Sequence, residues 1–117
     1  MWTIVPQNLA FNKVQHMLNI EKVKQLANSG DVKRQYILGI AYQYGEGVTM
    51  DGTKAVYWYK KAAKLGNAKA QYFLGFNYYL GKYVEKDLHK AVEWLTKSAE
   101  QGDVDAIDLL EHVKSKL

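Results

Sequence analysis

The chain alternates between segments whose apolar residues recur every three or four positions and short segments rich in glycine. The clearest example is Ala55, Trp58, Tyr59, Ala62 and Ala63, whose spacing places all five on one face of an α-helix. The chain contains nine glycines but only one proline. Because proline breaks helices and glycine commonly ends them, this pattern predicts several helices joined by glycine-containing turns.

The pattern itself repeats with a period of 36 residues. Residues 31–66 and 67–102 are identical at sixteen of 36 positions, and a third unit begins at Asp103 and ends after one helix. The matching pairs include Gln35/Gln71, Tyr36/Tyr72, Leu38/Leu74, Gly39/Gly75, Tyr42/Tyr78, Gly45/Gly81, Val48/Val84, Asp51/Asp87, Lys54/Lys90, Ala55/Ala91, Val56/Val92, Trp58/Trp94, Ala63/Ala99 and Gly66/Gly102.

Each unit is predicted to form two helices that pack against each other in opposite directions. Glycine inside a helix costs about 1 kcal/mol relative to alanine. Its recurrence at Gly39 and Gly75 therefore indicates a close approach of the neighbouring helix. Gly45 is expected to end the first helix, and Asp51 or Thr53 to cap the start of the second.

The first thirty residues are interpreted as a degenerate copy of the unit. Ile20, Val23, Leu26, Ala27 and Gly30 occupy the positions of a second helix. Upstream of them a different apolar stripe lies on the opposite helix face, which predicts a break near Asn19 and two short helices. That stripe consists of Ala10, Phe11, Val14, Met17 and Leu18.

These observations predict an all-α fold, a stack of about six to seven helices built from repeats. The chain is interpreted as one domain over residues 1–117. Its parts are a degenerate N-terminal unit (1–30), a first repeat (31–66), a second repeat (67–102) and a C-terminal capping helix (103–117).

The repeat can be written LGxxYxxGxGVxxDxxKAxxWxxKAAxxG, from Leu38 to Gly66, where x is any residue. With this motif the chain resembles the Sel-1-like repeat family, over residues 31–102 in full and 103–117 in part. The resemblance implies an α/α superhelix, a tetratricopeptide-like right-handed solenoid of antiparallel helix pairs. It also implies a protein that holds protein partners, often as an adaptor or assembly factor.

Two departures from the family pattern limit what can be carried over. Some secreted members have a cysteine pair in every repeat and have been linked to a β-lactamase-like activity, but this chain has no cysteine. In the second repeat Tyr83 replaces the second glycine of GxGV, which is Gly47 in the first. That loop is therefore expected either to adopt a different shape or to present an aromatic side chain to a partner.

In the tetratricopeptide relatives, the side of the first helix opposite Leu38 lines a concave groove, and the resemblance implies the same here. We refer to the residues on this side of the first helices as the predicted groove. Aromatic anchors are typical of partner-binding surfaces, although several of these rings could instead pack between helices of adjacent units. Lysines at one end and aspartates at the other could orient a bound segment. The predicted groove comprises Lys33, Tyr36, Ile40, Gln43, Tyr44, Lys69, Tyr72, Phe76, Tyr79, Leu80, Asp105, Asp108 and His112.

Within this set, Tyr44 and Tyr79 are the preferred contact residues. Trp58 and Trp94, in contrast, recur on the face that carries the alanines of the second helix. They are predicted to lie in the core.

The charge of the chain disfavours nucleic acid as a partner. The net charge is +4, and Arg34 is the one arginine, although arginine is the usual reader of phosphate and guanine. Lysines that solvate exposed helix faces explain the charge better. No apolar run is long enough to cross a bilayer and the first residues do not resemble a signal peptide, so a cytoplasmic protein without membrane contact is expected.

No motif points to a metal, a cofactor or a catalytic group. His16, His89 and His112 share no motif, and the chain has no cysteine to serve as a nucleophile or zinc ligand. Asp103, Asp105 and Asp108 lack the glycine and distal glutamate of a calcium loop, and are better explained as the cap and first turn of the last helix. The chain ends in Ser-Lys-Leu, which is also a peroxisomal address.

The sequence therefore predicts a non-catalytic module that binds another protein, either a peptide or a folded domain. One alternative is a bacterial immunity protein that neutralises a cognate toxin. A second is a hydrolase acting on cell-wall-like substrates, for which Glu46 is the one acid near the first loop. Self-association through an open end of the stack, giving a homodimer, is also left open.

Overall fold

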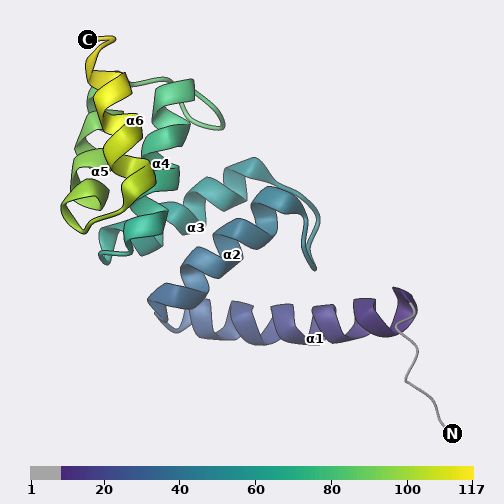
Figure 1. Cartoon of the computed structure of the whole chain (residues 1–117). Coiled ribbons are helices and arrows are strands. Elements are labelled where there is room, and N and C mark those ends of the chain that lie inside the picture. Colours follow the sequence, from purple (N-terminus) through teal and green to yellow (C-terminus); the bar gives the residue numbers. More distant parts are fainter. Residues whose placement is uncertain (1–8) are drawn as a thin grey trace, which may run out of the picture.

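The computed structural model describes the backbone from Leu9 to Leu117 and the side chains from Asn19 onward. Over these residues the chain is all-α. The helices are α1 (Leu9–Asn28), α2 (Val32–Tyr44), α3 (Gly52–Lys64), α4 (Ala68–Leu80), α5 (Leu88–Glu100) and α6 (Val104–Lys114). Each packs against the next along the chain, and α4 also contacts α6 (Figure 1). The described part is thus a helical solenoid in which contacts are made mainly between neighbours in sequence.

The helix ends follow the same chemistry in both repeats. Asp51 and Asp87 cap α3 and α5, and each carboxylate accepts a hydrogen bond from the backbone N–H three residues later. Gly45 and Gly81 end α2 and α4 in the left-handed region, at φ of 70° and 69°. Aspartate caps and glycine stops were both expected from the sequence, because each satisfies backbone groups that a helix end leaves without partners.

The predicted close approach at the helix glycines is confirmed. A Cβ atom on Gly39 would lie 2.6 Å from two ring carbons of Tyr59, and one on Gly75 would lie 2.7 Å from Cγ of Leu95. Carbon atoms in contact lie about 3.5–4.0 Å apart, so neither glycine leaves space for a side chain. The two helices of each repeat therefore pack in contact at these points.

The predicted break near Asn19 is wrong. The backbone of α1 is helical without interruption from Leu9 to Asn28. No glycine or proline lies within this range, so no helix-breaking residue accompanies the change of apolar face in the sequence. The upstream stripe (Ala10, Phe11, Val14, Met17 and Leu18) lies outside the described side chains.

The second half of α1 packs as a second helix of a repeat would. Ile20 and Ala27 are buried and form a cluster with Leu38 and Ala41 of α2 and Trp58 of α3. A larger cluster spans the other helices and includes Tyr59, Leu74, Leu95, Ala106 and Val113. The core therefore consists of two clusters, with Tyr42 packed against both, and no repeat buries its apolar face alone.

The two tryptophans differ, although the sequence places both in the core. Trp58 is buried, with 8% of its surface exposed, and the ring of Tyr57 packs edge-on against it at 5.1 Å between centroids. Trp94 is half-buried and lines an open hollow of about 430 Å³. Glu93 stands where the first repeat has Tyr57, so Trp94 has no aromatic partner at this position, unlike Trp58. The core prediction is thus confirmed for Trp58 and only partly met for Trp94.

Candidate partner-binding site

Side chains of the predicted groove lie on α2, α4 and α6, the first helices of successive units. The structure brings several of them together across units. Lys69 Nζ of α4 lies 3.1 Å from Asp105 Oδ2 of α6, and His112 Nε2 lies 2.9 Å from Tyr79 Oη. Lys33 and Asp108 are both exposed, and neither forms an ion pair among the described residues.

Lys69 and Asp105 of the predicted groove lie side by side, whereas the sequence suggested that lysines and aspartates mark its opposite ends. Lys69 Nζ contacts both Asp103 Oδ2, at 3.0 Å, and Asp105 Oδ2. These hydrogen bonds, to Asp103 first, raise the pKa of Lys69 above its ordinary value. The lysine of one repeat therefore neutralises the acidic first turn of the next, because stacking places position 69 beside the start of α6.

An aromatic cluster occupies the middle of this face. Tyr36 of α2 lies 6.3 Å from Phe73 of α4 between ring centroids, and Tyr72 stacks on Phe76 at 6.0 Å. All four rings are half-buried. The alternative that several of the rings pack between helices thus describes Tyr36 and Tyr72 well, since both pack against the core.

A hollow of about 180 Å³ opens beside this cluster, between the two repeats, and we call it the inter-repeat hollow. Four of its lining side chains are large, apolar and well exposed: Tyr44 (60%), Met50 (64%), Leu80 (49%) and Tyr83 (48%). The hollow is lined by Gln43, Tyr44, Met50, Ala55, Val56, Tyr59, Phe73, Phe76, Asn77, Leu80, Lys82 and Tyr83. Four predicted groove residues are among them, namely Gln43, Tyr44, Phe76 and Leu80.

Sequence reasoning missed Met50 and Phe73 as members of this site. Met50 lies in the loop between α2 and α3, where no helical period applies, and it contacts Gly45. Phe73 lies one position beside the predicted stripe, at the place that Ile37 has in the first repeat. Only the packing of α4 against α3 shows that its ring stacks on Tyr59, at 5.3 Å.

Tyr83 resolves one of the alternatives left open by the sequence. Its φ of 64° matches the 76° of Gly47 in the first repeat, so the loop keeps the same shape despite the side chain. The ring packs against Gly52 at the start of α3, so closely that a Cβ atom on this glycine would overlap with it. A left-handed conformation is unfavourable for tyrosine, and the contact with Gly52 compensates for part of that strain.

The floor of the inter-repeat hollow is polar at one point. Tyr59 Oη donates a hydrogen bond to Oε1 of Gln43. Burial raises the pKa of Tyr59 well above its ordinary value of 10.0, with smaller contributions from Tyr36 and Tyr44. Burial also raises the pKa values of Tyr36 and Tyr72.

These shifts predict that the protein is less stable at alkaline pH. Each of the three tyrosines loses its proton more readily in the unfolded chain, so the stability present below about pH 10 falls as the pH rises further. Lys69 acts in the same direction, because its folded pKa is also raised. Circular dichroism during urea unfolding, from about pH 8 to pH 12, measures this loss.

The variant Tyr59→Phe serves as the control for that prediction. It keeps the ring but removes the phenol, so its stability is expected to fall less steeply with pH than that of the wild type. An unfolding free energy that stays constant across this range would contradict the assignment.

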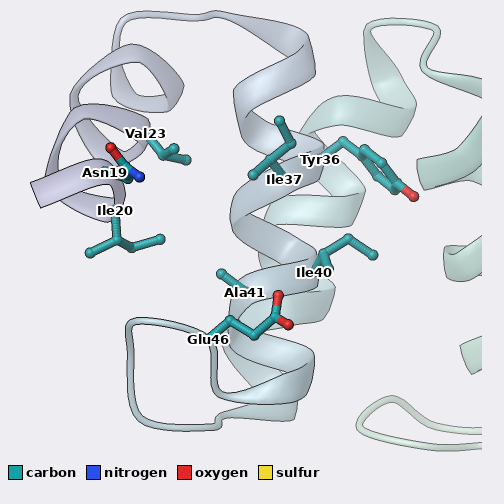
Figure 2. Close-up of a pocket in the computed structure, with 8 residues that line it drawn as sticks. All are labelled: Asn19, Ile20, Val23, Tyr36, Ile37, Ile40, Ala41 and Glu46. Carbon is teal, nitrogen blue, oxygen red and sulfur yellow. The ribbon is translucent and has the colours of Figure 1, made fainter. Parts of the chain in front are cut away.

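A second hollow, of about 410 Å³, lies between α1 and α2. Figure 2 shows Ile20 and Val23 of α1 on one side, and Ile37 and Ala41 of α2 on the other. Tyr36 and Ile40 of the predicted groove also line it. Glu46 is its one acidic lining residue, so among the described residues the hollow lacks the second carboxylate that a glycosidase-type site needs.

The described residues contain neither a membrane-spanning helix nor a cluster of metal-binding side chains. From Leu9 to Leu117, no helix combines the length and the hydropathy needed to cross a bilayer. From Asn19 onward, His, Asp and Glu side chains nowhere gather in groups of three that could hold a metal ion.

Comparisons with known proteins identify the architecture. A crystal structure of a Sel1 repeat protein from Oxalobacter formigenes superposes with a TM-score of 0.77 at 31% identity, over 80% of this chain and 39% of that one. Cysteine-rich protein B of Helicobacter pylori superposes with a TM-score of 0.73 at 28% identity, over 78% of this chain and 68% of that one. A protective antigen of uropathogenic Escherichia coli with an SLR fold superposes with a TM-score of 0.69 at 40% identity, over 72% of this chain and 18% of that one.

Among curated proteins, the secretory immunoglobulin A-binding protein EsiB of E. coli O6:H1 is 42% identical over 45 residues. This match covers 38% of the chain and 9% of EsiB, so the chain corresponds to a small part of that relative. The family model for the Sel1 repeat matches residues 35–67 and 68–103, which is more than half of the chain. Sel1 repeat proteins are typically scaffolds for protein–protein interaction, and the chain belongs to this family.

Proposed function

We propose that the chain is a non-catalytic module that binds another protein through the predicted groove, with the inter-repeat hollow as its centre. The observation that supports this most directly is the convergence of Tyr44, Met50, Leu80 and Tyr83 on one hollow, each about half or more exposed. Isolated exposed apolar residues are common on protein surfaces, but a contiguous group around a concavity is typical of interaction sites.

The chemistry of the hollow favours an apolar side chain of the partner. Aromatic and aliphatic groups form most of its wall, and a volume of about 180 Å³ suits one large side chain. The amide of Asn77 and the ammonium of Lys82 at the rim offer polar contacts. Such an arrangement, an apolar anchor within a polar rim, is the general form of a binding hot spot.

The relatives are consistent with this proposal. EsiB is named for binding secretory immunoglobulin A, which is itself a protein. Whether this chain acts as an adaptor or as an immunity protein for a toxin depends on the identity of its partner. A cytoplasmic location stays a prediction of the sequence.

The test is co-purification of the tagged chain from cells of its source, with quantitative mass spectrometry. The double variant Tyr44→Ser with Leu80→Ser is expected to lose at least about tenfold of any specifically retained partner, because both side chains would contribute hot-spot contacts. Both residues are exposed, so the variant should fold, which circular dichroism checks.

A matched control is the double variant Val104→Ser with Ile107→Ser. It removes two apolar side chains of comparable exposure (67% and 44%) from α6, away from the inter-repeat hollow. Equal retention of one partner by the wild type and the hollow variant would contradict the proposed site. Loss in the α6 variant alone would assign binding to the end of the stack.

A further inference from the structure

The two repeats provide an internal comparison that reveals a second surface. Helices α3 and α5 occupy equivalent places, yet the solvent-facing side of α3 has diverged. Tyr57, Lys64 and Leu65 stand where the second repeat has Glu93, Glu100 and Gln101. Because both helices serve the same structural role, the fold alone does not explain why the first repeat has an aromatic, a cation and an aliphatic residue in place of two acids and an amide.

The substitutions concentrate positive charge on α3. This helix carries Lys54, Lys60, Lys61 and Lys64 and no acidic residue, whereas α5 has two lysines and two glutamates. None of the four lysines forms an ion pair in the part of the chain from Asn19 onward. The ammonium of Lys61 lies over the rings of Tyr57 and Trp58, at 5.5 and 5.6 Å.

Apolar surface is exposed within this charged face. Tyr57 is 53% exposed and Leu65 is 58% exposed. Positions 57, 61, 64 and 65 have the i, i+4, i+7, i+8 spacing of a single helix face. We call the surface formed by Tyr57, Lys61, Lys64 and Leu65 the α3 face.

A buried hydrogen-bond acceptor next to the α3 face has no donor. In the second repeat, Gln101 Nε2 donates to Gln71 Oε1 at 3.0 Å and to Gly66 O at 2.8 Å. In the first repeat the equivalent of Gln71 is Gln35, which is 3% exposed and donates to Ala27 O at 3.3 Å. Its Oε1 accepts no hydrogen bond from any described residue, because Leu65 stands where Gln101 would.

We propose that the α3 face is a docking surface for an acidic segment of a partner protein. The ammonium groups of Lys61 and Lys64, which form no ion pair with any described residue, attract carboxylates, while Tyr57 and Leu65 offer contacts to an apolar side chain of that segment. The unpaired Oε1 of Gln35 is buried, so it marks how the first repeat has diverged beside the face and is not itself a contact point. This surface is separate from the inter-repeat hollow, and the inference does not depend on the function proposed for the hollow.

The same observations favour protein over nucleic acid. Tyr57 offers one ring on which a base could stack, but Leu65 beside it is aliphatic and offers none. The one arginine, Arg34, lies on α2, where its guanidinium is 4.0 Å from the carboxylate of Asp31.

The test uses a triple variant in which three residues of the first repeat are replaced by their equivalents from the second repeat. The substitutions are Tyr57→Glu, Lys64→Glu and Leu65→Gln. These residues already occupy the equivalent positions of α5, so the variant is expected to fold. The single variant Leu65→Gln supplies the missing donor to Gln35 and is expected to unfold at a higher temperature than the wild type. The probe is a phage library of random linear peptides selected on the wild-type chain.

The expected result is enrichment of acidic peptides that carry an apolar residue, with affinity at least about tenfold weaker for the triple variant. The hollow variant Tyr44→Ser with Leu80→Ser should bind them like the wild type, which separates this inference from the proposed function. The reciprocal variant Glu93→Tyr, Glu100→Lys and Gln101→Leu should gain a second binding site. If the triple variant does not fold, the single variant Lys64→Ala replaces it, because the Lys64 side chain is exposed.

Three results would overturn the proposal. One is a failure to enrich peptides, and another is enrichment of peptides that are not acidic or that bind the triple variant equally well. The third is a fluorescent oligothymidylate that binds the wild type and fails to bind the triple variant, which would assign the face to nucleic acid.

Discussion

Replacing Trp58 by alanine is expected to lower the free energy of unfolding by about 3–5 kcal/mol, the usual loss for a buried aromatic side chain. Trp58 is 8% exposed and joins α1, α2 and α3 through Ile20, Ala27, Leu38 and Ala41. Its removal would leave a cavity between three helices that cannot close without moving the first repeat. Urea unfolding followed by circular dichroism measures the loss.

The equivalent change Trp94→Ala is the matched comparison. Trp94 is half-buried beside an open hollow of about 430 Å³, so water already reaches part of its ring. We expect it to cost at least about 1 kcal/mol less than Trp58→Ala, since less apolar surface leaves the core. Equal losses for the two variants would contradict this account of how Tyr57 and α1 cover the first tryptophan.

Local signals predicted the repeat architecture because its elements are set by short stretches of chain. The aspartate caps at Asp51 and Asp87 and the glycine stop at Gly45 depend on neighbours within about four residues. The glycines at 39 and 75 were informative for the same reason, since an unfavourable residue inside a helix needs a packing explanation. α1 is the exception, because a change of apolar face resembles a helix end although the backbone continues.

The candidate site could be predicted only in part. The helical period placed Tyr44 and Leu80 on the same side of their helices as the rest of the predicted groove, and both line the inter-repeat hollow. It could not place Met50, which lies in a loop beside Gly45, where no helical period applies. Nor could it show that Lys69 bridges to Asp103 and Asp105, because that contact depends on how far one repeat is shifted relative to the next.

The contrast between Gln35 and Gln71 shows a further limit. The two glutamines are identical in the sequence pattern and similarly buried, yet only Gln71 has both ends of its amide paired. The difference arises thirty residues later in each unit, at Leu65 and Gln101. Such a dependence becomes visible only when the stacking of the helices is known.

The packing of Gly75 against Leu95 allows a sharper test of the fold. Gly75→Ala would place a Cβ atom 2.7 Å from Cγ of Leu95 and 3.3 Å from the carbonyl oxygen of Ala91. Alanine favours a helix over glycine by about 1 kcal/mol, but forcing α4 and α5 apart typically costs about 1–3 kcal/mol. We therefore expect net destabilisation despite the better helix former.

Leu95→Ala alone is expected to cost about 2–5 kcal/mol, because Leu95 is fully buried in the larger core cluster. In the double variant the Cβ atom added at position 75 would enter space that the leucine side chain has vacated. The combined loss should therefore be smaller than the sum of the single losses, by about 0.5–3 kcal/mol for residues in contact. Urea unfolding of all four proteins completes the cycle. Additive losses would mean that Gly75→Ala destabilises the fold through something other than crowding against the Leu95 side chain, such as the 3.3 Å approach of the added Cβ atom to the carbonyl oxygen of Ala91.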